Sequence, residues 1–228
     1  MLRTRPMAAL AAVLSLALLA GGCAGDPEPR ERQGAAGTEA AAPAETAPRP
    51  AERSDAPPAA RASDTDPALA ARLLEAALNG DTDAVGEALL RRADPNVMNE
   101  NGRTPLMFAA FNGHAGCARQ LLEHGAEVDL RDMDGRTALM FASSGPFVET
   151  VEILLDAGAD PLAVGSLEQF TPLMFAASEG LAPVVRILLD HGADPSAVDA
   201  DGDTALAFAR MHGHADVVAL LEDAGTGR

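Results

Sequence analysis

The sequence predicts an all-α fold, a solenoid of about five helix-turn-helix repeats joined by short β-hairpin-like turns. The first observation is the phrase TPLMFAA, which begins at Thr104 and recurs letter for letter at Thr171. Near copies, TALMFAS and TALAFAR, begin at Thr137 and Thr204, so the four threonines are 33, 34 and 33 residues apart. The second observation is that a closing glycine keeps the same spacing farther along each unit, and that a leucine pair recurs before it at spacings of 33, 34 and 32 residues. A fixed period in this range is typical of a solenoid that stacks one supersecondary unit.

Each unit begins with a tight turn and a short helix. The turn formers NENG at residues 99–102 precede the first phrase. The hydroxyl of Thr104 can cap a helix, and Pro105 suits the first helical position because its missing N–H leaves no bond unmade. Apolar residues then follow at helical spacing. Gly113 can end this helix, because glycine adopts the left-handed closing conformation without strain.

A second helix is predicted to follow the first in every unit. In the first clear unit it runs from about residue 114 to residue 123 and is expected to bury Cys117, Leu121 and Leu122. Gly125 closes it in the same way as the first helix. One such unit cannot cover its apolar faces alone, whereas stacked units can.

The phrase, the period and the NGH and HGA closures resemble the ankyrin repeat, whose signature contains Thr-Pro-Leu-His and two alanines. The resemblance covers about residues 66–224, with four clear repeats and a degenerate first one, in which Asp66 and Pro67 can cap a longer helix. Arg210 stands where the other repeats have alanine or serine, which suits a terminal repeat that faces water. The expected repeats are about residues 66–98, 99–131, 132–164, 165–198 and 199–228.

The chain departs from the family pattern in three places. Met107, Met140 and Met174 stand at the position of the family's histidine, so we expect thioether packing between repeats in place of a polar network. Pro146 replaces a loop glycine, which predicts a locally rearranged loop. One extra residue lies in residues 164–170, where the turn glycine is also lost. We favour a bulged hairpin tip there, since loops tolerate insertion, and a grafted binding feature is the alternative.

The N-terminal residues predict export. Arg3 and Arg5 precede an apolar run, residues 7–20, which is too short to span a bilayer and has the form of a secretory signal peptide. The run leads into LLAGGC, which resembles the bacterial lipoprotein signal, although Ala20 stands where that family prefers leucine. The resemblance implies that Cys23 is lipidated and becomes the mature N-terminus. Ordinary cleavage and a soluble periplasmic or secreted protein are the alternative.

The predicted organisation has three parts. Residues 1–22 are the expected signal peptide, and residues 66–228 are the expected repeat domain. Between them, residues 23–65 hold the lipid attachment site and a stretch rich in Ala, Pro, Glu and Arg, almost devoid of large apolar residues. Such a composition cannot bury a core, so we expect a disordered tether. The resemblances therefore imply a location in the bacterial cell envelope.

The composition restricts the class of partner. The chain has a formal net charge of −17 and contains no lysine, tryptophan or tyrosine. Such a charge repels nucleic acid and anionic headgroups and favours a basic partner. We therefore expect no nucleic acid partner, membrane contact only through the lipid anchor, and a monomer that binds another protein with a basic or mixed apolar surface.

Signals for catalysis, metals and cofactors are weak, and we expect none of them. The five histidines all fall at positions that the repeat pattern explains. The DADGD run at residues 199–203 begins like a calcium loop, but Thr204 stands where that loop needs glycine and Arg210 where it needs glutamate. Cys117 is expected to be a small core residue and Cys23 the acyl site, so no disulfide is expected. We predict that the protein is not an enzyme.

The resemblance also implies where a partner would bind. In the ankyrin family, partners are held by the turn residues and by the end of the first helix of each repeat. The matching positions here are Glu100, Asn101, Arg103, Phe111, Asn112, Met133, Asp134, Arg136, Ser144, Phe170, Ser178, Glu179, Ala200, Asp201, Asp203, Met211 and His212. Phe111, Met133, Phe170 and Met211 are large apolar side chains among them, and we expect these four to face water as one contiguous patch. Scattered apolar residues on the surface are the alternative.

The expected function is that of a membrane-tethered module for protein–protein interaction in the cell envelope. It would scaffold, help or inhibit a partner protein, and the sequence does not choose among these roles. The alternative is a binder of a cation or a small molecule through the acidic hairpin tips.

Overall fold

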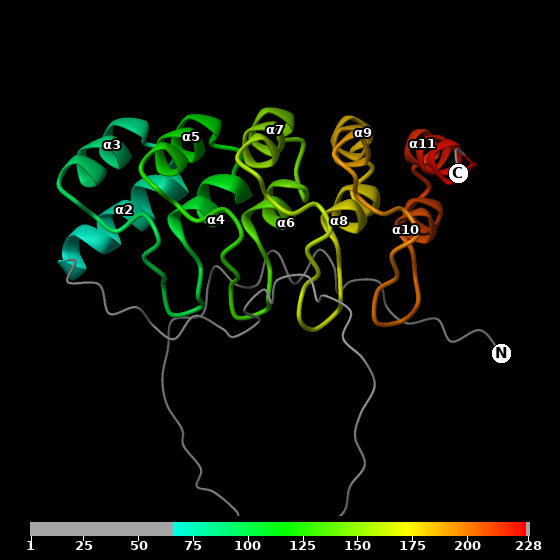
Figure 1. The fold of residues 1–228 in the computed structure, drawn as a ribbon, viewed down its shortest axis with the longest axis horizontal. Helices are drawn as coiled ribbons and strands as arrows, with labels where there is room; N and C mark the ends of the chain where they lie inside the picture. Colours follow the sequence, from blue (N-terminus) through cyan, green and yellow to red (C-terminus); the bar gives the residue numbers. More distant parts are fainter. Residues whose placement is uncertain (1–65, 227–228) are drawn as a thin grey trace, which may run out of the picture. The chain divides into compact units, whose positions relative to one another are not determined.

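The computed structural model describes residues 66–226. The predicted signal peptide, the proposed lipid attachment site and the tether lie outside the described residues. Within them the chain forms ten α-helices and no strand beyond one isolated bridge between Val198 and Thr204. The helices are arranged as five pairs in two rows, one row of first helices and one of second helices (Figure 1). The predicted all-α repeat solenoid is therefore confirmed.

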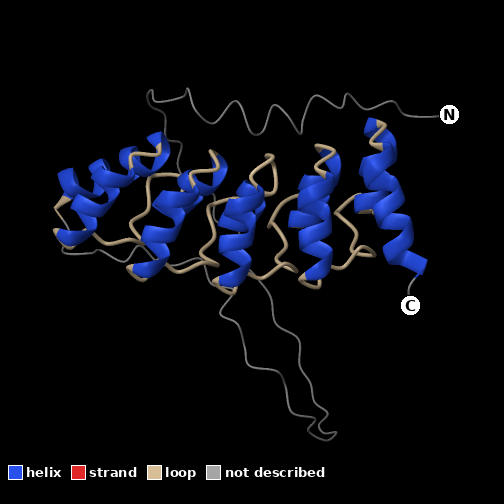
Figure 2. Cartoon of the chain, turned by 90° about the horizontal axis from the view of Figure 1, so that it is seen from above, coloured by secondary structure: helices blue, strands red, loops and turns tan. Residues whose placement is uncertain are grey.

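Every helix contacts its own pair partner and the equivalent helices of neighbouring pairs. The first helices are α2 (Pro67–Asn79), α4 (Pro105–Phe111), α6 (Ala138–Ala142), α8 (Pro172–Ser178) and α10 (Ala205–His212). The second helices are α3 (Thr82–Leu90), α5 (Ala115–Glu123), α7 (Val148–Asp156), α9 (Ala182–Asp190) and α11 (Ala215–Thr226). Seen from above, the pairs follow one another along the long axis of this domain (Figure 2). No helix within the described range is long and apolar enough to cross a membrane.

The first helices begin where the sequence places their caps. The hydroxyl oxygens of Thr104, Thr137, Thr171 and Thr204 each accept a hydrogen bond from the backbone N–H three residues later, at 3.2 to 3.5 Å. In the degenerate first repeat, a carboxylate oxygen of Asp66 accepts the N–H of Ala68 at 3.0 Å instead. Local sequence therefore specifies where each first helix starts.

The closing glycines are required for two reasons. Gly113 has φ +70°, a conformation that other residues adopt only with strain. A Cβ on Gly113 would also lie 2.1 Å from the ring of Phe147 in the next repeat. Gly80 is covered in the same way by the ring of His114, whose Nε2 is 3.2 Å from the carbonyl oxygen of Leu78. Each of these glycines therefore ends a helix and also leaves space for an aromatic or histidine ring of the next repeat to pack against that helix end.

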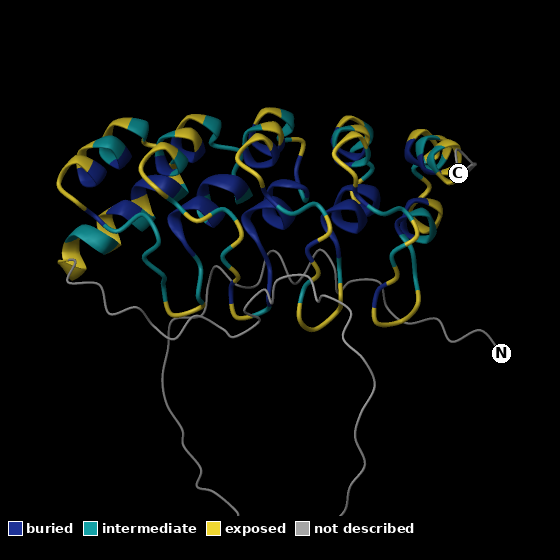
Figure 3. Cartoon of the chain, in the orientation of Figure 1, coloured by how far each residue is buried: buried dark blue, intermediate teal, exposed yellow. Residues whose placement is uncertain are grey.

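The core is formed by the inner first helices and by the sides of the second helices that face them, where buried residues are concentrated (Figure 3). Met107, Met140 and Met174 are each 1% exposed, so the expected burial of these thioethers between repeats is confirmed. The sulfur of Met174 also accepts the N–H of Thr171 at 3.5 Å. In the second helix of the first clear repeat, the expectation is wrong for Leu122, which is only half-buried because it lies at the edge of the buried face.

Two irregular positions of the sequence, Pro146 and Arg210, have the structural effect that was predicted for them. The loop that holds Pro146 is rearranged: α6 ends at Ala142, and residues 143–146 form consecutive turns. At the C-terminal end, Arg210 is exposed and its Nη2 donates to Glu222 Oε1 at 2.6 Å, whereas the equivalent residues of the inner repeats are fully buried. Because no further repeat covers α10 within residues 66–226, a charged side chain is tolerated at this position.

Candidate protein-interaction surface

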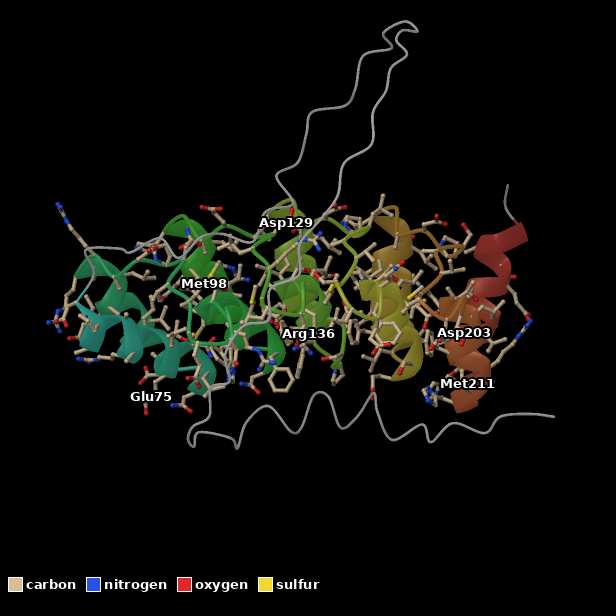
Figure 4. The ribbon with its side chains drawn as sticks, turned by 90° about the horizontal axis from the view of Figure 1, so that it is seen from below. Glu75, Met98, Asp129, Arg136, Asp203 and Met211 are labelled. Carbon is tan, nitrogen blue, oxygen red and sulfur yellow. The ribbon has the colours of Figure 1, made fainter. Side chains whose placement is uncertain are left out.

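Four long loops connect each second helix to the next first helix, and they project below the first helices (Figure 1). We call them loop 1 (residues 91–104), loop 2 (124–137), loop 3 (157–171) and loop 4 (191–204). In the view from below, Asp129 lies near one long edge of the domain and Met211 near the other, with Met98, Arg136 and Asp203 between them (Figure 4). The loops therefore form a row on this face, and loop 2 runs from one long edge at Asp129 to the middle at Arg136 (Figure 4).

The tips of loops 1, 2 and 4 are held by one side chain each. Asn99, Asp132 and Asp199 each accept hydrogen bonds from the backbone N–H groups two and four residues later, at 2.8 to 3.0 Å. Such side-chain turns fix a hairpin tip without a β-sheet. Loop 3 has no such residue, and its tip passes through Gln169 at φ +55°.

Neighbouring tips are joined by backbone hydrogen bonds, one between each pair of loops. The donors and acceptors are Met133 N to Asn101 O at 3.1 Å, Ser166 N to Asp134 O at 2.9 Å, and Ala200 N to Glu168 O at 3.1 Å. The four tips thus form one continuous row in which equivalent positions stand side by side.

Loops 1 and 2 share a cluster of buried charges. The Asp132 side chain is 2% exposed, and its Oδ2 lies 3.2 Å from Nε of Arg136 and 3.6 Å from Nε of Arg103. Arg136 also pairs with Asp134. Both guanidinium groups lie over the ring of Phe141, 5.1 and 5.2 Å from its centroid. We call these five residues the arginine cluster. Its ion pairs and cation–π contacts fix the register of loop 2 against loop 1.

Loop 3 forms an aromatic cluster with α8 and α10 at the equivalent place. Phe170 precedes its capping threonine, as Arg103 and Arg136 do. Its ring packs edge-to-face against Phe175 and Phe208, with centroids 5.6 and 5.5 Å apart. We call these three residues the aromatic cluster. No charge is buried in it, and its contacts come from apolar area and ring geometry.

The structure divides the predicted partner-binding residues into three groups by exposure. The exposed ones are Glu100, Asn101, Met133, Glu179, Ala200, Asp201, Met211 and His212. The half-buried ones are Arg103, Phe111, Asn112, Asp134, Ser144, Phe170 and Asp203, and the buried ones are Arg136 and Ser178. Only the first group is fully available to a partner.

The expectation that four large apolar residues face water is wrong for two of them. Phe111 packs edge-to-face on Phe141, 6.1 Å between centroids, and Phe170 belongs to the aromatic cluster. Both rings pack against the core because a flat side chain at these positions fills the space between neighbouring repeats. Met133 and Met211 are exposed as expected. Replacing the two phenylalanines would therefore disturb packing as well as any contact with a partner.

Several polar candidates are used inside the domain. The Asn112 amide donates to the carbonyl oxygen of Leu78 in the preceding repeat at 2.9 Å. The Ser144 hydroxyl donates to the carbonyl oxygen of Phe141 at 2.7 Å, and the Ser178 hydroxyl is buried without a hydrogen-bond partner. The hydrogen bonds of Asn112 and Ser144 contribute to the fold, and all three side chains present little surface to a partner.

Exposed apolar residues in loop 3 are a feature that the sequence reasoning missed. Leu162, Val164 and Leu167 are exposed, and so is Val198 in loop 4. The extra residue near residue 167 marks the segment in the sequence, but the repeat pattern alone does not say which side chains point outward.

Cys117 is a core residue, as expected. It is 1% exposed, and burial raises the pKa of its thiol, although the Thr82 hydroxyl 3.8 Å away lowers it in part. A thiol that stays protonated is a poor nucleophile. Within residues 66–226, no group of three or more His, Cys, Asp or Glu side chains is arranged to hold a metal ion.

Two family models match the chain. A model of ankyrin repeats in three copies matches residues 73–164, and a model of ankyrin repeats in many copies matches residues 154–209. Together they cover the loops and both clusters described above. Among curated proteins, none matches the chain.

Proposed function

The chain belongs to the ankyrin repeat family, and from this premise we propose that it is a membrane-tethered module that binds another protein in the bacterial cell envelope. Ankyrin repeats generally mediate protein–protein interaction, and proteins built from them are typically binding scaffolds without enzymatic activity. The partner would carry a basic or mixed apolar surface, because the chain has a net charge of −17.

The row of loops is the observation that carries this proposal. Side-chain turns fix three of the tips, and backbone hydrogen bonds join each tip to its neighbour. A surface that is already ordered loses little conformational entropy when it binds. Exposed residues of different chemistry, such as Glu100, Met133 and Asp201, occupy this row and can recognise a partner.

Sequence features support the tethered location. Arg3 and Arg5 before a short apolar run, followed by Cys23, have the order of a lipoprotein signal. Several acyl chains on one cysteine would hold the protein stably at a membrane, which a single chain would not. The proposed tether of residues 23–65 would let the repeat domain reach a partner away from the membrane surface.

Affinity capture of the full-length protein from crosslinked native envelopes tests the binding function. We expect a specific partner whose recovery falls at least about tenfold when Glu100 and Met133 are both replaced by alanine, since few side chains dominate an interface. The control pair is Glu149→Ala with Arg186→Ala, two exposed residues on second helices. Equal loss with the control pair, or the absence of any specific partner, would contradict the proposal.

Membrane fractionation tests the tether separately. We expect the native N-terminal residue to be an acylated Cys23, and Cys23→Ser to release the protein from the membrane fraction. Mass spectrometry of the N-terminal peptide reads the modification directly. A free, unmodified N-terminus beyond Cys23 would mean that the protein is cleaved and soluble, which is the alternative stated above. The binding function of the loops would be unaffected by that result.

A further inference from the structure

The exposed large apolar side chains are concentrated on one part of the loop row. Seven such side chains occur in residues 66–226, and three of them, Leu162, Val164 and Leu167, lie within six residues of loop 3. Leu167 at the tip is 72% exposed. Val198 of loop 4 is also exposed. We call these four residues the loop 3 patch.

Hydrogen bonds hold the patch in place on both sides. The side chain of Arg131 in loop 2 donates through Nη1 to the carbonyl oxygen of Val164 at 2.6 Å. The N–H of Ala200 in loop 4 donates to the carbonyl oxygen of Glu168, next to Leu167, at 3.1 Å. The apolar side chains are therefore presented by a backbone that is anchored to both neighbouring loops.

Loop 3 departs from the other loops in three ways. It contains one extra residue, lacks the turn-forming Asn or Asp, and adopts φ +55° at Gln169, where the other tips have glycine. A non-glycine residue in this conformation costs free energy, as it does at Arg92 of loop 1, so the strain alone does not mark a binding site. A bulged tip with polar residues would satisfy the fold equally well, so the apolar residues need a separate explanation.

The loops that carry the patch are acidic, although the guanidinium of Arg131 in loop 2 lies beside Val164. Loops 3 and 4 together contain six Asp and Glu residues and no lysine or arginine. A second copy of the chain would bring the same negative charge, and the chain's own residues 23–65 contain almost no large apolar side chain to fill the patch. A segment that alternates apolar residues with lysine or arginine matches both features.

We propose that the loop 3 patch docks a segment of a partner protein in which apolar side chains are flanked by basic ones. This inference rests on the proposed function and adds the place and the chemistry of the contact. Leu167, Val164 and Val198 supply the apolar contact, and carboxylates are the only charged side chains of loops 3 and 4.

A library of random dodecapeptides, selected on the purified full-length chain, tests the proposal. We expect the enriched peptides to combine Leu, Ile, Val or Phe with Lys or Arg. They should bind at least about tenfold more weakly to the double variant Val164→Ser, Leu167→Ser, because a few apolar side chains dominate such contacts. The matched control is Leu90→Ser, which removes a leucine that is 80% exposed at the end of α3 and should leave binding unchanged. Both replaced patch residues are exposed, so the double variant should melt at the same temperature as the parent chain.

Four outcomes would overturn the proposal. They are selection of acidic or purely polar peptides, selection of none, equal binding to the parent and the double variant, and a dimer in sedimentation that the double variant abolishes. The last outcome would assign the patch to a second copy of the chain. The envelope capture described above separates this inference from the proposed function. Suppose that the Val164→Ser, Leu167→Ser variant captures the partner normally and the Glu100→Ala, Met133→Ala variant does not. The proposed function is then supported, and the loop 3 patch is not the site of binding.

Discussion

The position before the capping threonine is filled by Arg103 and Arg136 in the first two clear repeats and by Phe170 in the third. Arg103 lies over the phenylalanine ring of the next repeat, Phe141, and Phe170 packs on the ring of the next repeat, Phe208. The two regions thus place a flat group against the same ring with different chemistry. At residues 103 and 170 a planar group fills the space between repeats, and that group can be either charged or aromatic.

The arginine cluster constrains the shape of its loop more than the aromatic cluster does. Buried arginines need a carboxylate, and Asp132 supplies it while also holding the tip of loop 2. Loop 2 is therefore restricted to the compact turn that places Asp132 correctly. Phe170 needs no counter-ion, so loop 3 can do without the turn residue and can hold an extra one. The aromatic cluster is what makes the exposed tip at Leu167 compatible with a packed repeat.

Met140→Ala should give the largest effect, because it removes a buried side chain from the framework that both regions share. Met140 lies on α6, is 1% exposed and belongs to the row of methionines between repeats. We expect the free energy of unfolding to fall by about 2–4 kcal/mol, the usual cost of a cavity in a core. Urea unfolding followed by circular dichroism measures it. Met133→Ala, at a site 74% exposed, is the control and should change stability by less than about 0.5 kcal/mol. Similar values for the two variants would show that Met140 is not a core residue.

Asp132→Asn should separate the ion pairs of the arginine cluster from the turn. Asparagine keeps the tip hydrogen bonds, as Asn99 shows in loop 1, but it leaves two largely buried arginines without their shared carboxylate. We expect a loss of about 2–3 kcal/mol, slightly below the usual cost of removing one partner of a buried pair.

The control for this change is Asp199→Asn in loop 4. Asp199 makes the same tip hydrogen bonds, and within residues 66–226 no arginine pairs with it. We expect a loss below about 0.5 kcal/mol. Equal losses at the two sites would mean that the turn, and not the buried charge, stabilises loop 2.

Phe170→Ala should lower the free energy of unfolding by about 2 kcal/mol, which is less than the loss expected for Met140→Ala or Asp132→Asn. The ring is only half-buried, but the change removes two edge-to-face contacts. Phe170→Arg should cost only about 1 kcal/mol, because Asp199 and Phe208 stand where Asp132 and Phe141 stand for Arg103. Thermal and urea unfolding of both variants provide the comparison. Adding Asp199→Asn should remove the advantage of arginine over alanine. If arginine is no better than alanine, the two clusters are not interchangeable.

Gln169→Gly should give the smallest effect, a gain of about 0.5 kcal/mol. Glycine adopts φ +55° without strain, and its greater freedom in the unfolded chain offsets part of that benefit. Chemical denaturation with replicate measurements can resolve such a change. Arg92→Gly, at φ +65° in loop 1, is the comparison at a regular loop and should behave alike. A loss of stability at residue 169 alone would mean that the Gln169 side chain itself supports loop 3.

Much of the fold could be predicted because the ankyrin repeat is encoded locally. The threonine caps, the closing glycines and the buried methionines recur at fixed spacing, and each acts through contacts within a few residues or at an equivalent place in every repeat. The irregular loop at Pro146 and the exposed Arg210 of the last repeat were also predictable, since each breaks the pattern at one identifiable position.

The exposure of the candidate site was less predictable because it depends on the neighbouring repeat. The pattern of its own repeat predicts that Phe170 faces water. Its ring instead packs against Phe208, which lies 38 residues later in the sequence. The sequence likewise predicts that the Asn112 side chain is exposed, whereas in the structure it donates a hydrogen bond to the carbonyl oxygen of Leu78. The sequence by itself determined the period, the caps and the core of each repeat, because these follow from local propensity and spacing. Only the tertiary structure decided which loop side chains face water, because that depends on what the adjacent repeat places against them.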